Sequence, residues 1–351
     1  MIRVLIIVGC LVAVALGWWL YRHGSFDSFA QKPGEVFIRV GDYSEPHLPA
    51  QAYAGHYLPY ALFAVWAYDR AVAGSPRLDG LLKLPAGGNI VRPITAELLD
   101  SWRADWVVRE QVDGPLPCPE GEGNCGGRAL GGLGYKVFSS ASRNEIVVAF
   151  RGTDFHEADD WISNFRWVTR FLPYYDQYEQ VQRHIGPILD RALAAHGQSN
   201  PRIVATGHSL GGGLAQQAAY KDGRIRAVYA FDPSTVTGYY DPGVRGKENS
   251  VGLLIDRVFQ RGEILAYLRF FMTQLYPVSA FDPQTRTVRF SFGAHGNIVA
   301  KHSIDDLAAG LLGVAGSAGE WASRAKPLPN APGENPGENW IYRLIAWVNR
   351  K

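Results

Sequence analysis

The chain is poor in cysteine, in charged residues and in net charge. It has three cysteines in 351 residues, and charged side chains make up 19% of it, with 35 basic against 33 acidic residues. The formal net charge of +2 gives no electrostatic case for binding nucleic acid, where a basic stripe would be expected, so we predict no nucleic-acid partner. Hydrophobic residues make up 47%, which excludes intrinsic disorder and leaves ample material for a buried core.

The cysteines give no metal-binding pattern. Cys118 and Cys125 stand in one loop rich in glycine and proline, with no second pair and no neighbouring histidine. This is a poor zinc site. One interpretation is a disulfide between the two, which would require an oxidising compartment, and the other is two free thiols.

The N-terminus contains the longest apolar run. Val4 to Tyr21 carries no charged side chain and as a helix would reach about 27 Å, just enough to cross a bilayer core. The run predicts an uncleaved transmembrane anchor rather than a signal peptide cut near Ala13-Val14-Ala15. With the cysteine loop, it favours a single-pass membrane protein whose main domain faces the periplasm or the exterior.

The remaining sequence predicts an α/β fold with a mostly parallel sheet, because strand and helix patterns alternate along it. The expected domains are an anchor or signal segment (1–23), a linker (24–56) with one extended stretch at 35–40, a main α/β domain (57–315), and a Pro/Gly-rich tail (316–351) ending in an amphipathic helix. We expect helices over 57–73, 96–109, 175–195, 211–221 and 303–312, and strands over 134–139, 145–150, 202–206, 226–231, 257–260 and 287–292.

One pentapeptide carries the chemistry. Gly207-His208-Ser209-Leu210-Gly211 fits G-x-S-x-G, and it follows an apolar strand and precedes a helix. This strand–turn–helix context holds the serine exposed above a sheet, at a helix N-terminus that favours developing negative charge. We therefore predict Ser209 as a nucleophile, and its neighbour His208 is wrongly placed to be its base.

A serine hydroxyl needs a histidine to take its proton and a carboxylate to orient that histidine. In this scaffold the chain order is serine, acid, histidine, so only His295 and His302 are candidates for the base, and spacing alone does not choose between them. Counting strands after the serine places the acid at Glu263, with Asp232 as the fallback. Asp256 is expected to precede its strand and so to lie at the wrong end.

A resemblance supports these assignments. Ile146-Val-Val-Ala-Phe-Arg-Gly-Thr153, then Asp160-Trp161, then Gly207-His-Ser-Leu-Gly-Gly212 resembles the fungal-type, or class 3, lipase family of the α/β-hydrolase superfamily. That family hydrolyses lipid esters, and the resemblance covers about residues 57–310.

The resemblance also implies roles for particular residues. It implies Thr153, with the backbone N–H of Leu210, as the oxyanion hole. The His302-Ser303-Ile304 context is similar to that of the family's catalytic histidine, which favours His302 over His295. The family's acid is an aspartate, so Glu263 is a departure, although this fold uses either acid.

In that family a lid follows the Phe-Arg-Gly strand, which here corresponds to 154–172. Trp161, Phe165 and Val168 share one face of a helical pattern there. Either this face packs permanently on the core, or it opens at a lipid surface and uncovers the acyl pocket.

The expected function is hydrolysis of lipid carboxylic esters through an acyl-enzyme on Ser209, without a metal or an organic cofactor. The expected partners are a lipid ester substrate and a membrane surface; the sequence names no protein partner. The alternatives are a catalytically inactive, membrane-anchored binding protein on the same fold, and a secreted phospholipase toxin or effector.

Overall fold

The fold is taken from a computed structural model of the whole chain. The residues whose structure is described are 31–40, 43–70, 75–84, 96–118, 132–152, 176–234, 236–239, 246–263, 265, 283–293 and 300–315. The predicted anchor, the lid segment and the C-terminal tail lie outside these ranges. Within them, no helix has both the length and the apolar character needed to cross a membrane.

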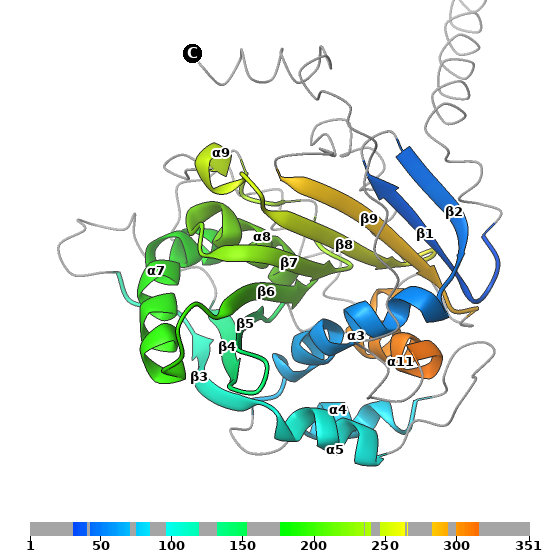
Figure 1. The fold of residues 1–351 in the computed structure, drawn as a ribbon, viewed down its shortest axis with the longest axis horizontal. Coiled ribbons are helices and arrows are strands. Elements are labelled where there is room, and N and C mark those ends of the chain that lie inside the picture. The colour runs from blue at the N-terminus through cyan, green and yellow to red at the C-terminus, as the bar shows by residue number, and fades with distance from the viewer. Residues whose placement is uncertain are drawn as a thin grey trace, which may run out of the picture.

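The described strands form one sheet that organises the molecule (Figure 1). Its order is β2-β1-β9-β8-β7-β6-β5-β4-β3. The strands are β1 (Glu35–Val40), β2 (Tyr43–Pro49), β3 (Val107–Gly114), β4 (Leu133–Ser140), β5 (Glu145–Phe150), β6 (Arg202–His208), β7 (Ile225–Phe231), β8 (Leu254–Gln260) and β9 (Gln284–Ser291).

The five central strands, β5 to β9, are parallel to one another. Two antiparallel strands flank them on each side. The predicted α/β fold with a mostly parallel sheet is therefore confirmed. Because the carboxyl ends of parallel strands meet at one edge of the sheet, the residues that follow β6, β7, β8 and β9 are brought together.

Helices cover both faces of the sheet. They are α3 (Gln51–Trp66), α4 (Pro76–Leu81), α5 (Ala96–Ala104), α7 (Gln177–His196), α8 (Leu210–Lys221), α9 (Gly246–Asn249) and α11 (Ile304–Ala315), with a short 3-10 turn, η2, at Ala300–His302. One hydrophobic core lies between the sheet and α3, α4, α5 and α11, and a second lies between the sheet and α7 and α8. Helices α3 and α11 pack side by side on the first face (Figure 1).

Strand β5 is largely apolar because both of its faces are covered. All six residues of β5, Glu-Ile-Val-Val-Ala-Phe, are buried, and alternate side chains enter the two cores. This is the pattern of a strand buried on both sides rather than one with a solvated face. It explains why this strand was found from the sequence.

The edges of the sheet differ from the sequence prediction. The segment expected as a linker with one extended stretch contains two paired strands, β1 and β2, and β1 pairs with β9. At the other edge, the helix expected over 96–109 ends at Ala104, and β3 begins at Val107. Both missed strands, β2 and β3, are polar and partly exposed, so their sequences lack the apolar run of a central strand.

Candidate active site

Ser209 lies at the sharp turn between β6 and α8. Its backbone has φ 55° and ψ −122°, a conformation that residues other than glycine rarely adopt. The glycines on either side are required by the packing. A Cβ placed on Gly207 would overlap the Gly211 carbonyl, and one on Gly211 would overlap the carbonyl oxygen of Phe150. The predicted strand–turn–helix context is present.

Backbone hydrogen bonds hold this turn in place. The N–H of Ser209 donates to the Phe231 carbonyl at 3.0 Å, and the Ser209 carbonyl accepts from the N–H groups of Gly212 at 3.0 Å and Ser234 at 2.9 Å. The Ser209 side chain makes no capping bond to α8. Its hydroxyl is therefore available to a partner outside the helix.

That partner is His302. The Oγ of Ser209 lies 3.1 Å from His302 Nε2, and His302 Nδ1 lies 3.0 Å from Oε2 of Glu263. All three side chains are buried. A carboxylate only accepts hydrogen bonds, so His302 Nδ1 carries the proton and Nε2 accepts from the serine hydroxyl. The sequence-predicted serine, histidine and glutamate are brought together in the order that proton transfer requires.

Glu263 is placed by the turn that ends β8. Gly262 has φ +78°, a conformation that favours glycine, and the N–H of Leu265 donates to Glu263 Oε2 at 2.8 Å. Asp256, expected just before this strand, lies within it instead. It forms a buried ion pair with Arg286 of β9, with Nε 2.5 Å from Oδ1, and this pairing engages it away from the triad.

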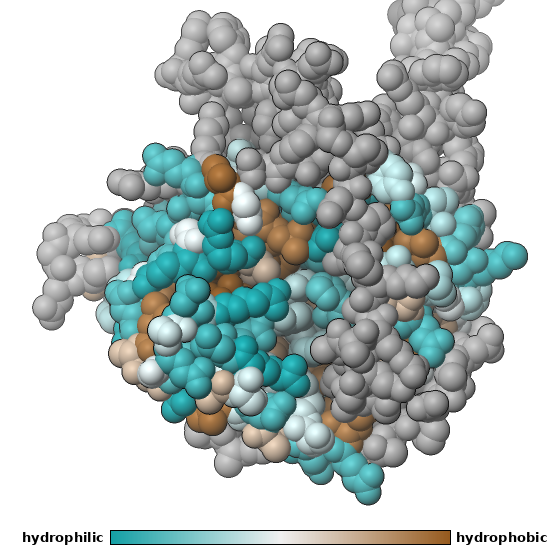
Figure 2. All heavy atoms as spheres, in the orientation of Figure 1, coloured by the Kyte–Doolittle hydropathy of each residue, from teal (hydrophilic) through white to brown (hydrophobic). Residues whose placement is uncertain are grey.

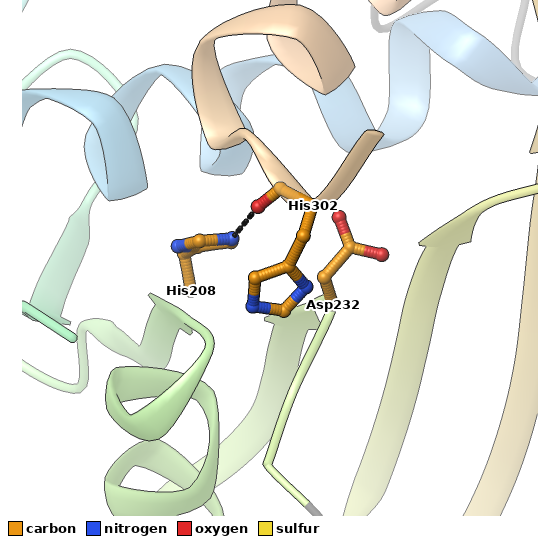
Figure 3. A group of neighbouring side chains, drawn as sticks. All are labelled: His208, Asp232 and His302. Atoms are coloured by element: carbon orange, nitrogen blue, oxygen red, sulfur yellow. Dashed lines mark hydrogen bonds between the residues drawn. The ribbon is translucent and has the colours of Figure 1, made fainter. Parts of the chain in front are cut away.

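Asp232, the fallback acid, follows β7 and lies close to the same histidine. It is fully buried, has φ 39° and accepts the N–H of Gln260 at 3.2 Å. Figure 3 shows it beside His302 and His208, and nitrogen and carboxylate atoms of these three residues lie within 4.8 Å of one another. The direct bond to the His302 ring nevertheless comes from Glu263.

The group of His208, Asp232 and His302 also has the composition of a metal site. However, Nε2 of His208 is bonded to the His302 carbonyl, and its Nδ1 is bonded to the hydroxyl of Tyr68. Both ring nitrogens of His302 are engaged by the serine and the glutamate. All four ring nitrogens of the two histidines are therefore already engaged in hydrogen bonds.

The backbone after β5 lies directly against Ser209. A Cβ placed on Gly152 would lie 2.5 Å from the His208 carbonyl oxygen, 2.6 Å from the Tyr68 hydroxyl and 3.3 Å from Ser209 Cβ. Only glycine allows this approach. The residue after Gly152 is Thr153, the predicted oxyanion residue, which lies outside the described residues.

Arg151 anchors the same segment from the other side. The guanidinium of Arg151 lies 2.5 Å from the carboxylate of Asp113 in β3. The backbone N–H of Arg151 donates to the Gly134 carbonyl at 2.9 Å. The hydrogen bond from Arg151, together with its charge, holds the pKa of Asp113 below the ordinary value. The arginine of the Phe-Arg-Gly motif therefore fixes the backbone just before Gly152.

Several other predicted site residues lie beyond the described ranges. They are the predicted lid residues Trp161, Phe165 and Val168 and the alternative base His295. Leu210, by contrast, is the first residue of α8, a position whose N–H has no acceptor within the helix.

Sequence reasoning missed the surroundings of His302. The sequence indicates only that His208 is wrongly placed to be the base of Ser209, whereas in the structure its Nε2 bonds to the His302 carbonyl at 2.8 Å. Tyr68, its other partner, lies 140 residues earlier in the chain. No local pattern marks Tyr68, so nothing in the sequence could have found it.

The structure also bears on the cysteine loop. Cys118 is disulfide-bonded. Cys125 and Cys10 lie outside the described residues, so the pairing of Cys118 with Cys125 stays a prediction.

Comparison with known proteins matches the part of the chain that contains Ser209. Residues 131–232 match a family model described as phospholipase-like, a Tle-like phospholipase domain. An extracellular phospholipase A1 from Serratia liquefaciens is 31% identical over 127 residues, which are 34% of this chain and 36% of that protein. The chain thus matches about a third of the length of this relative.

Solved structures with some similarity are fungal lipases. The lipase of Rhizopus microsporus var. chinensis is 16% identical with a TM-score of 0.40, covering 62% of this chain and 70% of that one. Lipase II of Rhizopus niveus is 19% identical with a TM-score of 0.38, covering 62% and 74%. The resemblance to lipolytic enzymes that the sequence predicted is confirmed, and residues 131–232 are similar to a Tle-like phospholipase domain.

Proposed function

We propose that this protein is a serine hydrolase that cleaves carboxylic esters of lipids. The observation that carries the proposal is the hydrogen-bonded chain from Ser209 Oγ through the His302 ring to Glu263, with distances of 3.1 and 3.0 Å. A nucleophile, a base within reach of it and a carboxylate that orients the base are the arrangement that activates serine for acyl transfer.

The reaction proceeds in two halves. In the first, Ser209 Oγ forms a bond to the ester carbonyl carbon while His302 Nε2 takes the hydroxyl proton. The tetrahedral intermediate then loses the alcohol, which receives that proton from His302, and an acyl-serine remains. In the second half, water attacks the acyl carbon, His302 takes and returns a proton again, and the fatty acid leaves Ser209.

Glu263 stabilises the imidazolium that forms in each half. It is fully buried, and a buried carboxylate interacts with a neighbouring positive charge more strongly than an exposed one does. We propose that the N–H of Leu210 and the residue Thr153 hold the negative oxygen of the intermediate. The contact between Gly152 and the nucleophile supports this placement.

The substrate class rests on the comparisons. A phospholipase-like family model and a phospholipase A1 relative favour a phospholipid over a small soluble ester. The name of that relative also favours a location outside the cytosol. We propose that the protein acts at a membrane surface, which places the enzyme where its substrate is; the apolar run at Val4–Tyr21 could anchor it there.

The test measures ester turnover by the full chain. Wild type and Ser209→Ala are compared on p-nitrophenyl butyrate and on phosphatidylcholine vesicles, with circular dichroism to check folding. We expect the alanine variant to lose at least about 10³-fold in kcat on both substrates while keeping its melting temperature. Release of the sn-1 fatty acid would identify A1 specificity. Equal turnover by the two proteins would contradict the proposal.

A further inference from the structure

His302 is held by its backbone as well as by its ring. Its carbonyl oxygen lies 2.8 Å from Nε2 of His208, the residue just before the nucleophile (Figure 3). A carbonyl only accepts, so His208 Nε2 carries the hydrogen. In the neutral ring Nδ1 is then an acceptor, and the hydroxyl of Tyr68 donates to it at 2.9 Å. His208 and Tyr68 are both buried.

Tyr68 is in turn fixed by a charged pair. The guanidinium of Arg77 lies over its ring, with Cζ 4.6 Å from the ring centroid, within the range of a cation–π contact. Nε of Arg77 lies 2.9 Å from both carboxylate oxygens of Asp305. Asp305 belongs to the first turn of α11, three residues after His302.

These contacts form a ring. From His302 they run through His208, Tyr68 and Arg77 to Asp305, and the three peptide bonds between Asp305 and His302 complete the ring. We call these five residues the base clamp. The clamp draws on the segment after α3, the start of α4, the end of β6 and the start of α11, so it joins four parts of the fold around the catalytic histidine.

We propose that the base clamp positions the catalytic histidine, with Tyr68 and His208 acting on the reaction through the backbone of His302. The proposal rests on the proposed serine hydrolase function. His208 is adjacent in the chain to Ser209, so its bond to the His302 carbonyl sets the separation of nucleophile and base directly. Displacement of a catalytic group by about 1 Å can cost on the order of 10²-fold in rate.

The base clamp also contacts the backbone at Gly152, which leads to the proposed oxyanion residue Thr153. The backbone of Gly152 lies against the Tyr68 hydroxyl and the His208 carbonyl. Tyr68 therefore contacts the segment that leads to the proposed oxyanion residue as well as the residue that holds the base. Removing its hydroxyl would loosen two catalytic elements while leaving Ser209, His302 and Glu263 in the chain.

The experiment uses the full chain with four single substitutions and the double variant that combines Tyr68→Phe with His208→Leu. Tyr68→Phe removes one hydroxyl, His208→Leu removes both ring nitrogens, and His208→Gln keeps an N–H at about the position of Nε2. Tyr43→Phe, which removes a hydroxyl in the edge strand β2, is the matched control. Each protein is assayed for kcat and KM on p-nitrophenyl butyrate, for the rate of labelling by a fluorophosphonate, and for melting temperature.

We expect Tyr68→Phe and His208→Leu to lower kcat and the labelling rate at least tenfold, with KM within twofold of wild type. His208→Gln should keep at least a third of the wild-type kcat, because its amide can still donate to the His302 carbonyl. Adding Tyr68→Phe to His208→Leu should cause much less than the product of the two single losses, since Tyr68 acts largely through His208. Tyr43→Phe should match wild type.

Three results would overturn the proposal or the function on which it rests. If kcat and labelling stay within twofold of wild type in Tyr68→Phe, or if only the melting temperature falls, the clamp is structural and the proposal is wrong. Equal losses in His208→Gln and His208→Leu would also overturn it. Should His208→Leu fail to fold, Tyr68→Phe and His208→Gln decide the question. A wild-type protein that neither turns over ester nor reacts with the fluorophosphonate would instead remove the proposed function, and the clamp with it.

Discussion

Ser209 combines a strained backbone with a side chain that does not bond to its own helix. A non-glycine residue in such a conformation costs on the order of 1–3 kcal/mol and persists only where its surroundings hold it. Here the surroundings are the backbone bonds to Phe231, Gly212 and Ser234. The strain directs the hydroxyl away from α8 and toward His302, so the cost in stability is tied to the position of the nucleophile.

The two carboxyl groups near His302 can be separated by substitution. Glu263→Gln should lower kcat at least about 10²-fold, because an amide cannot stabilise the imidazolium and can hold the ring in the wrong tautomer. Asp232→Asn should lower kcat less than tenfold, because the direct bond to the ring comes from Glu263. Steady-state kinetics on a soluble ester measure both, and a larger loss in Asp232→Asn would exchange the roles of the two acids.

At the scale of elements, the site depends on how closely β5, β6 and α8 approach one another. The crossing of these elements leaves no room for a side chain at Gly211, which meets the carbonyl of Phe150. A Cβ added to Gly80, in α4, would meet no atom within 4 Å. Packing therefore requires a glycine at position 211 but does not require one at position 80.

This difference gives a paired prediction. Gly211→Ala should destabilise the protein by more than about 2 kcal/mol, because backbone atoms would have to move. Gly80→Ala should be neutral or raise stability by up to about 1 kcal/mol, since alanine favours helix. Urea denaturation checks both. A Gly211→Ala protein as stable as wild type would show that the turn is looser than the structure indicates.

Helix α3 contributes a partly buried histidine, His56, that lies outside the group of Ser209, His302 and Glu263. The ring of His56 packs against Tyr57 and Tyr229, and its Nε2 has no hydrogen-bond partner among the described residues. Burial lowers the pKa of His56 to about 4. Because this folded-state pKa lies below the ordinary value, the folded protein favours the neutral ring, and stability is lost as the pH falls from about 6.5 toward 4.

Acidification should therefore weaken the wild type more than a variant that cannot titrate here. Between pH 7 and pH 5 the contribution of His56 to unfolding free energy should fall by about 2 kcal/mol. His56→Gln should lack this component, so its urea midpoint should drop less over the same interval. Parallel drops in the two proteins would show that His56 does not control acid stability.

For the whole molecule, the face in Figure 2 shows a described surface that is mostly hydrophilic, with hydrophobic side chains in separate places. The apolar material lies instead in the two cores on either side of the sheet. The chain also carries a disulfide at Cys118, which fits a protein that folds in an oxidising compartment.

A thiol count tests this feature of the whole chain. With three cysteines in the sequence and Cys118 bonded within the chain, the denatured, unreduced protein should show one free thiol, and the reduced protein three. Cys118→Ser should show two before reduction, because the former partner is released. Three thiols in unreduced wild type would mean that the bond does not form in the isolated protein.

The sequence predicted the parts of the molecule that are encoded locally or by order along the chain. The turn at Ser209 is specified by its own pentapeptide, and Glu263 follows from counting parallel strands. The edge strands β2 and β3 escaped because they are polar, and the base clamp escaped because it is built from distant pairs. Arg77 and Asp305, for example, are 228 residues apart, and only the packing of α11 beside α3 and α4 brings them together.

The central claim is that Ser209 is a nucleophile activated by His302. Labelling with a fluorophosphonate, followed by peptide mapping, tests it most directly, because the probe reports activation without needing the natural lipid. We expect a single adduct on Ser209 in wild type, none in Ser209→Ala, and labelling slowed at least about 10²-fold in His302→Ala. An adduct on another residue, or wild-type labelling of His302→Ala, would contradict the account.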